Sequence, residues 1–364
     1  MSRSWHRKIL FRVDAGQHVG MGHLMRCVAL AEALRTRGWN ALFCAFDENG
    51  LARRVLKQAG LEAARWRLNS CSKIGQGEDL RETLRFGERL GTRLIVIDSY
   101  SISNDFLRHL KKLGWFVACI DDHVRQCPDV DLVVNGNVGA EELDYPCTKQ
   151  TRLLLGPKYS LLRREFHELR EGLGVLPIKP LVENVLVGFG GSDPHEQTAR
   201  VLRLLEGIPE PFSVDVLITS YYRNPTTVQS LAGRSKRKIR LVYEPARVGH
   251  AMRRCDLAIT AASTMGYELA CLGVPFLVMK LYENQRFVYH HLVRKQIAVA
   301  GGKLGVQSDR LVVRQFRRLF RSYQLRVSLQ QKATQTIDGL GAERVADVLC
   351  SAFERFQRAA LQRT

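Results

Sequence analysis

Residues 256–285 read DLAITAASTMGYELACLGVPFLVMKLYENQ, and this one stretch contains the pattern that decides the fold. An apolar run at 256–260 is followed by Ser263 and Thr264, two residue types that cap helices, and then by a segment of helical period. A second apolar run occupies 275–279. Near-continuous apolar runs are typical of strands that are buried on both faces. The order strand, helix, strand predicts a parallel sheet between layers of helices.

The same alternation recurs on both sides of this stretch. Apolar runs predict strands at 8–13, 41–46, 94–98, 116–121 and 130–134, and again at 184–189, 214–219, 239–243, 256–260 and 275–279. Amphipathic segments predict helices at 22–37, 78–90, 194–205, 264–273 and 284–295, and residues 307–358 contain helical patterns alone. We therefore expect an α/β protein with two doubly wound, Rossmann-type parallel sheets.

The length of 364 residues fits two domains better than one hydrophobic core. The segment 171–182, EGLGVLPIKPLV, is rich in Gly and Pro and separates the two series of strands, so it is the predicted linker. The expected domains are 1–175 and 176–364, the second with a helical extension at its C-terminal end. Ligands of such sheets bind at the carboxyl ends of the strands, so we expect the two domains to face a shared cleft.

Composition limits the possible partners and compartments. The net charge of +19 favours anionic partners such as nucleotides, phosphosugars, nucleic acids or an acidic membrane surface. The nine cysteines are an odd number without a C-x-x-C pair, which argues against a disulfide framework and a zinc ribbon. No signal-peptide pattern opens the chain, and no apolar run approaches the ~20 residues of a spanning helix. We expect a soluble, cytoplasmic protein.

The first candidate site follows the first predicted strand. Arg12 and Asp14 lie at the end of that strand, and Gly20 and Gly22 precede His23 at the start of a helix. The glycines allow the backbone to approach a ligand, and the helix start offers N–H groups to anionic oxygens. The positive end of the helix favours a neutral imidazole, so His23 is a candidate general base, against the simpler alternative of a packed histidine. The glycine spacing does not match a dinucleotide fingerprint, which disfavours an oxidoreductase.

Further candidate sites follow strands of the second half. Gly190, Gly191 and Ser192 form either an ordinary strand-to-helix turn or a loop over a diphosphate. The other candidates are the helix start at Ser263, Thr264 and Met265, the carboxylate of Glu268, and the amides of Asn284 and Gln285. The helix start could hold a diphosphate, and Glu268 could accept both hydroxyls of a ribose. The two amides are suited to sugar or phosphate oxygens.

These blocks together resemble a known family. The chain is similar to the UDP-2,4-diacetamido-2,4,6-trideoxy-beta-L-altropyranose hydrolases of pseudaminic acid biosynthesis, which are relatives of GT-B glycosyltransferases. The resemblance covers roughly residues 8–300 and rests on FRVDAGQHVGMGHLMRCVALAEAL, VIDSY, the pair Asp121-Asp122, LVVNGN, LLLGPKYSLLRREF, VGFGGSDP and AITAASTMGYELACLGVPFLVMKLYENQ. It implies a GT-B-like fold and hydrolysis of a UDP-linked, N-acetylated deoxy sugar with inversion at the anomeric carbon. UDP would lie on the second domain and the sugar would project toward the first.

The resemblance also implies roles for individual residues. His23 corresponds to the base that activates water, and Tyr100 and Asn284 correspond to further catalytic positions. Glu268 corresponds to the ribose ligand. Ala261-Ala262 stand where family members usually carry glycine, which leaves the identity of the sugar open.

Alternative functions remain open at this stage. A GT-B glycosyltransferase would use a lipid or sugar acceptor in place of water, and a non-catalytic nucleotide-sugar-binding protein would not need His23. The basic clusters at 234–240 and 310–323 are interpreted as solvated surfaces, with peripheral membrane contact as the less favoured alternative. No nucleic-acid recognition motif is present. We expect no cofactor and no metal, since only Asp121-Asp122-His123 approaches a ligand cluster.

Overall fold

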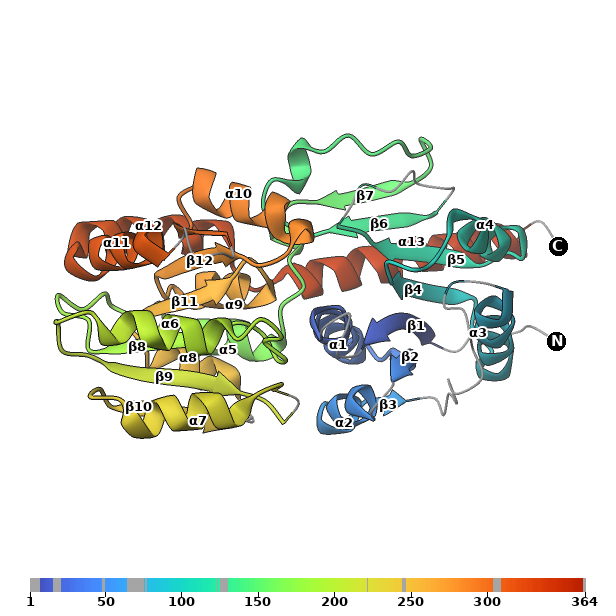
Figure 1. Ribbon diagram of the computed structural model, residues 1–364. Coiled ribbons are helices and arrows are strands. Elements are labelled where there is room, and N and C mark those ends of the chain that lie inside the picture. The colour runs from blue at the N-terminus through green and yellow to red at the C-terminus, as the bar shows by residue number, and fades with distance from the viewer. Residues whose placement is uncertain are drawn as a thin grey trace. The chain divides into compact units, whose positions relative to one another are not determined.

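The computed structural model describes residues 7–15, 21–47, 50–63, 75, 77–122, 124, 130–220, 222–243, 247–303 and 309–362. The chain divides into two compact units (Figure 1). Unit 1 comprises Met1–Arg164 and Leu340–Thr364, and unit 2 comprises Glu165–Gly339.

Unit 1 is built on a seven-stranded parallel sheet with the order β3-β2-β1-β4-β5-β6-β7. The strands are β1 (Lys8–Ala15), β2 (Asn40–Asp47), β3 (Glu62–Ala63), β4 (Leu94–Asp98), β5 (Phe116–Ile120), β6 (Leu132–Asn135) and β7 (Arg152–Leu155). The helices are α1 (Gly22–Arg35), α2 (Leu51–Gln58), α3 (Gly77–Leu90), α4 (Asn104–Lys112) and α13 (Gly341–Leu361), with short 3₁₀ turns η2 (Ala140–Glu142) and η3 (Pro157–Tyr159).

Unit 2 repeats this plan with a six-stranded parallel sheet of order β10-β9-β8-β11-β12-β13. The strands are β8 (Asn184–Gly188), β9 (Ser213–Ile218), β10 (Ile239–Tyr243), β11 (Leu257–Ala261), β12 (Phe276–Lys280) and β13 (Val299–Lys303). The helices are α5 (Arg164–Leu173), α6 (Gln197–Glu206), α7 (Pro225–Arg234), α8 (Val248–Arg253), α9 (Thr264–Leu272), α10 (Arg286–Arg294), α11 (Asp309–Arg321) and α12 (Tyr323–Thr336), with the 3₁₀ turn η4 (Glu283–Gln285).

The prediction of two doubly wound parallel sheets is confirmed. Each predicted strand matches an observed one to within about two residues, and the stretch 256–285 folds as β11, α9, β12 and η4. β4 and β11 are buried along their whole length, as strands covered on both faces must be. The sequence analysis did not predict β3, β7 and β13. Among the described residues, no helix is both long and apolar enough to cross a bilayer.

The C-terminal helix differs from the expected domain boundaries. The sequence placed residues 340–364 with the second domain, whereas α13 packs into the core of unit 1. Val345, Leu349 and Phe353 are buried there, and the Phe353 ring lies 5.7 Å from the ring of Phe116 on β5. The physical reason is that the apolar face of α13 completes the cover of the unit 1 sheet on the side of α1.

The predicted linker 171–182 also differs from its expected role. Its first residues end α5, and the segment that follows is tied to unit 2 by side chains that donate to its carbonyl oxygens. Arg253 donates to the oxygen of Gly174 at 2.8 Å, Gln330 to that of Leu176 at 2.6 Å, and Arg326 to that of Pro180 at 2.8 Å. Residues 174–182 are therefore held against unit 2, and we call this segment the strap.

The basic helix predicted at 310–323 is α11, which ends at Arg321. Its apolar side chains Val312, Phe316 and Leu319 are buried in the core of unit 2, where Phe316 packs 5.5 Å from the ring of Phe212. The core-facing side of α11 is consequently covered by protein, whereas Arg310, Arg314, Arg318 and Arg321 are exposed.

Candidate active site

The order of strands reverses at the same place in both units. In unit 1 the first strand, β1, lies between β2 and β4, and in unit 2 the equivalent strand, β8, lies between β9 and β11. Doubly wound proteins bind ligands at the carboxyl ends of the strands next to such a switch point. The segments after β1 and β4, and after β8 and β11, contain most of the predicted site residues.

His23 and Asp98 meet at this point of unit 1. His23 lies in the first turn of α1 and Asp98 is the last residue of β4. The Nδ1 atom of His23 lies 2.5 Å from the Oδ1 atom of Asp98, and both side chains are buried. A carboxylate can only accept a hydrogen bond, so Nδ1 bears the proton. In the neutral imidazole, Nε2 is then the nitrogen that can accept a proton.

Arg26 fixes this pair from the next turn of α1. Its Nε atom donates to Asp98 Oδ2 at 2.5 Å, and its Nη2 atom donates to Asp98 Oδ1 at 2.6 Å. Its Nη1 atom donates to Asp122 Oδ2 at 2.6 Å. One guanidinium therefore holds two carboxylates, and Asp98 is bound on both of its oxygens.

These contacts decide the charge of the two carboxyl groups. Burial alone would raise the pKa of Asp98, but the attraction of Arg26 and His23 outweighs burial and holds that pKa well below its usual range. Burial would also raise the pKa of Asp122, but the attraction of Arg26 outweighs burial, so the pKa of Asp122 is lowered as well. Both groups are carboxylates at neutral pH.

Tyr100 lies beside His23. Its ring meets the His23 ring edge-on with centroids 4.4 Å apart, and its hydroxyl donates to Asp122 Oδ2 at 3.2 Å. Asn137 donates to the other oxygen of Asp122 at 2.9 Å. Burial and the charge of Asp122 raise the pKa of Tyr100, so the phenol stays protonated at neutral pH. The side chain is 40% exposed, which leaves part of it accessible to a ligand.

Arg12 and Asp14 lie behind this group and are buried. Arg12 donates to both oxygens of Asp79, at 3.0 and 2.8 Å, and to Asp14 Oδ1 at 2.8 Å. The other oxygen of Asp14 accepts a hydrogen bond from Ser99. In this arrangement Arg12 and Asp14 tie β1 to α3 and to Ser99 after β4, and both side chains are buried. Gly22 opens α1, whereas Gly20 lies outside the described residues.

In unit 2 the loop after β8 is held by Asp193. Its carboxylate accepts the backbone N–H groups of Gln197 at 2.9 Å and Thr198 at 2.8 Å, and the hydroxyl of Tyr222 at 2.8 Å. Asp193 thus fixes the start of α6. Gly190 precedes it with a φ of +88°, a conformation that favours glycine, and a Cβ at Gly190 would meet nothing within 4 Å. The backbone of Gly190, Gly191 and Ser192 therefore forms an accessible turn at the carboxyl end of β8.

The helix start after β11 is the second element at this edge. Ser263 is the N-cap residue of α9, and its side chain makes no capping bond. Thr264 begins the helix, and Met265 packs against Gly188 at the end of β8. Glu268, one turn further, is buried with 8% exposure. The N-terminus of α9 is accordingly placed next to the glycine turn, a combination that can bind an anion.

The remaining predicted residues of unit 2 lie around this edge. Asn284 is exposed in η4. Gln285 uses its Oε1 atom to accept the N–H of Leu281 at 2.8 Å, which leaves its amide N–H groups as the donors that can face a ligand. The methyl groups of Ala261 and Ala262 are buried, so they pack inside the unit.

Sequence reasoning missed the partners of His23. Asp98 stands in the quoted block VIDSY and ends a buried strand at its carboxyl end, which is the signal that could have identified it. Arg26 lies three residues after His23, which places both on one face of the helix. Asp122 was considered only as a metal ligand. Among the described residues no group of three or more His, Cys, Asp or Glu side chains could hold a metal ion, and His123 lies outside the described residues.

Comparison with known proteins gives distant relatives. No family model matches the chain. It is 27% identical to an uncharacterized protein of Methanocaldococcus jannaschii over 79% of this chain, and it spans 58% of the length of that relative. It is 25% identical to the spore coat polysaccharide biosynthesis protein SpsG of Bacillus subtilis, over 94% of this chain and 97% of SpsG. It is 22% identical to the UDP-2,4-diacetamido-2,4,6-trideoxy-beta-L-altropyranose hydrolase of Campylobacter jejuni, over 79% and 97% of the two chains.

Solved structures share the architecture. Acinetobacter baumannii MurG superposes with a TM-score of 0.65 at 16% identity and covers 94% of this chain and 99% of its own. The UDP-GlcNAc 2-epimerase of Neisseria meningitidis, solved with UDP-GlcNAc bound, superposes with a TM-score of 0.64 at 11% identity and covers 94% and 100%. The chain therefore has the two-unit, GT-B-like fold of these enzymes and is distantly related to the C. jejuni hydrolase and to SpsG.

Proposed function

We propose that the protein hydrolyses a UDP-linked, N-acetylated deoxy sugar of the UDP-2,4-diacetamido-2,4,6-trideoxyhexose type to UDP and the free sugar. The observation that carries this proposal is the hydrogen bond between His23 Nδ1 and Asp98 at the switch point of unit 1. An imidazole held by a carboxylate on one nitrogen is the arrangement of a general base. The substrate class is supported by the distant similarity to the C. jejuni hydrolase.

In this mechanism Nε2 of His23 takes a proton from a water molecule. The water oxygen forms a bond to the anomeric carbon while the bond from that carbon to the UDP oxygen breaks. UDP leaves with the bonding electrons, and a single displacement inverts the anomeric centre. Asp98 stabilises the imidazolium that forms, and general base catalysis of this kind supplies on the order of 10²–10⁴ in rate. Tyr100, edge-on to His23, would contact the sugar or the attacking water.

UDP would be held by unit 2. The backbone of Gly190, Gly191 and Ser192 and the helix start at Ser263, Thr264 and Met265 would donate to the diphosphate. Glu268 would accept the ribose hydroxyls. Asn284 would act at the reaction centre, and Gln285 would donate to sugar or phosphate oxygens. Positive helix ends at the diphosphate would stabilise the departing UDP and take over the part that a cation plays in other enzymes.

The free amino sugar would be consumed in the synthesis of a nonulosonic acid of the pseudaminic type. The main alternative is a GT-B glycosyltransferase that transfers the sugar to a lipid or sugar acceptor. This alternative is supported by the similarity to SpsG, which extends over nearly the whole of both chains, and by the glycosyltransferase fold.

A panel of UDP-sugars, incubated with the protein in the absence of any acceptor, tests the proposal. We expect release of UDP and free sugar in equal amounts from a 2,4-diacetamido-trideoxy sugar, and the same rate in EDTA. Release of UDP only after an acceptor is added would support the transferase.

A further inference from the structure

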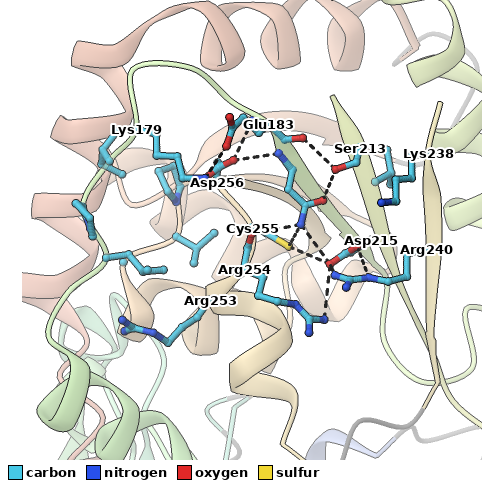
Figure 2. Close-up of a pocket in the computed structure, with 18 residues that line it drawn as sticks. Lys179, Glu183, Ser213, Asp215, Lys238, Arg240, Arg253, Arg254, Cys255 and Asp256 are labelled. Atoms are coloured by element: carbon cyan, nitrogen blue, oxygen red, sulfur yellow. Dashed lines mark hydrogen bonds and ion pairs between the residues drawn. The ribbon is translucent and has the colours of Figure 1, made fainter. Parts of the chain in front are cut away.

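A pocket of about 580 Å³ lies in unit 2 at the amino ends of the strands, away from the edge proposed for UDP (Figure 2). Its floor includes Asn184 at the start of β8, Ser213 at the start of β9 and Asp256 just before β11. Pockets that bind small molecules usually have volumes of roughly 300–1,000 Å³. The size suits a sugar phosphate or a mononucleotide.

One wall of the pocket is the strap that replaces the predicted linker. Leu176, Pro177 and Ile178 line it, and Val274 and Pro275 before β12 add to the same apolar side. Arg326 donates to the carbonyl oxygens of Lys179 at 2.9 Å and Pro180 at 2.8 Å, and its own side chain is buried. This wall is therefore held in place without a ligand.

The carboxylates of the pocket are all engaged with neighbouring groups. Asp215 is paired with Arg240. Asp256 accepts the N–H of Glu183 at 2.9 Å and lies 3.2 Å from Lys179, which also bonds Glu183 at 2.8 Å. Asn184 joins the two carboxylates into one network, because its backbone N–H donates to Asp256 at 3.0 Å and its side-chain amide donates to Asp215 at 3.3 Å (Figure 2). These ion pairs compensate the positive charges of Arg240 and Lys179.

Among the described residues, two cations of the pocket, Lys238 and Arg253, have no carboxylate partner, and a third, Arg254, shares Asp215 with Arg240 in a long ion pair. Within the described part of the chain, Lys238 has no side-chain partner, and Arg253 has no carboxylate partner. Arg253 donates to the carbonyl oxygens of Gly174 and Leu173 at the end of α5, and Arg254 approaches Asp215 only at 3.9 Å. The pocket consequently has an excess of positive charge next to an apolar wall.

This excess explains part of a basic cluster that the proposed function leaves unused. Within 234–240, Arg237 has a structural role. It donates to the carbonyl oxygens of Leu205 and Glu210, and its guanidinium stacks 3.9 Å over the Phe212 ring. Arg240 serves the ion pair with Asp215. The side chain of Lys238, which lies between them, makes neither structural bonds nor an ion pair of this kind with the described residues, and it lines the pocket.

We propose that this pocket binds a soluble phosphate ester of sugar-phosphate or mononucleotide size, at a site separate from the one proposed for UDP. Lys238 and Arg254 bind the phosphate, since ammonium and guanidinium groups pair strongly with its oxygens. Arg253, which Figure 2 shows on the opposite side of the pocket from Lys238, adds positive charge there. The apolar wall of the strap contacts the body of the ligand.

Calorimetric titration with glucose 6-phosphate and with inorganic pyrophosphate tests this site, with UDP present in excess. The pocket variant is the double substitution Lys238→Ala and Arg254→Ala. Both side chains are exposed, so their removal should leave the fold intact. The control is the double substitution Arg310→Ala and Arg314→Ala on the exposed face of α11, which removes the same charge elsewhere in unit 2.

We expect the Kd to rise by about tenfold or more in the pocket variant and to stay unchanged in the control, because each lost contact is a charge-assisted bond. Uncharged glucose should not bind. An equal loss of affinity in both variants would show that net charge, and not this pocket, causes the binding. If neither probe binds the unaltered protein, the proposed site is also wrong. Neither outcome depends on hydrolysis, so this test and the test of the catalytic proposal fail independently.

Discussion

The bond between His23 and Asp98 fixes which nitrogen of the imidazole bears the proton, and this is its expected contribution to catalysis. The substitutions His23→Asn and Asp98→Asn should each lower kcat by on the order of 10²-fold or more and leave UDP binding nearly unchanged. The first removes the base and the second removes the acceptor that keeps the proton on Nδ1. Steady-state kinetics with calorimetry of UDP checks this. Asp105→Asn, at an exposed carboxylate of α4, is the control, and near-full activity of His23→Asn would exclude His23 as the base.

Arg26 should make the stability of the protein depend on pH. Asp98 and Asp122 have lowered pKa values, so their contribution to stability is complete above roughly pH 4 and is lost as the pH falls through the lowered values. In Arg26→Leu, burial without the cation raises both pKa values, so the folded variant takes up protons and is relatively favoured in acid. The variant should lose about 3–5 kcal/mol at pH 7 and less at pH 5.

Urea unfolding at the two pH values measures this difference. The control Arg108→Leu breaks an exposed ion pair with Asp105 and should change stability by only about 0–1 kcal/mol at either pH. A loss for Arg26→Leu that is the same at both pH values would show that the guanidinium acts through packing alone.

Glu268 should act on binding and not on the chemical step. The substitution Glu268→Ala removes the proposed ribose acceptor, and a charge-assisted hydrogen bond is worth about 1.5–3 kcal/mol. We expect UDP affinity to fall by about 10- to 10²-fold in calorimetry. Glu171→Ala, at an exposed position of α5, should leave the affinity unchanged. An unchanged affinity of Glu268→Ala for UDP would show that Glu268 does not bind the ribose.

At the scale of secondary structure elements, the buried parallel strands were predictable because their apolar runs are continuous. β13 was missed because it reads VAGGK, and β7 because it reads RLLL, with Arg152 and Leu153 exposed. The candidate site residues that follow strands were predicted from glycines and caps, and they stay predictions. Asp98 and Arg26 were not assigned, because their role depends on a contact across 72 positions of the chain that local pattern does not encode.

The assignment of α13 could not come from local pattern either, since an amphipathic helix fits the apolar surface of either sheet. Its place in unit 1 predicts a large effect of Phe353→Ala, because Phe353 is buried against Phe116 and Trp39. The loss should be about 3–5 kcal/mol in denaturant unfolding. The control Arg355→Ala changes an exposed residue of the same helix. A loss below about 1 kcal/mol for Phe353→Ala would mean that α13 does not dock in solution.

At the scale of the whole molecule, two sheets with the same switch point carry different chemical groups there, each in its own unit. The switch point of unit 1 brings together an imidazole, two carboxylates and a phenol, whereas that of unit 2 has a glycine turn and a helix start. A UDP-sugar has matching parts, since its diphosphate needs N–H donors and its anomeric carbon needs an activated nucleophile. The proposed reaction requires both units to act on one substrate.

The origin of the oxygen in the products distinguishes the reactions that such a molecule could catalyse. If water activated by His23 attacks the anomeric carbon, turnover in ¹⁸O-labelled water places the label in the free sugar and none in UDP. Attack at phosphorus would label UDP instead, and mass spectrometry of both products separates these results. A transferase would turn over slowly until an acceptor was added, because its site must keep water from the sugar. We expect label in the sugar, because the His23–Asp98 pair provides a base for water without any acceptor. Slow release of UDP that a lipid or sugar alcohol stimulates many-fold would contradict hydrolysis and leave the same base to activate an acceptor hydroxyl.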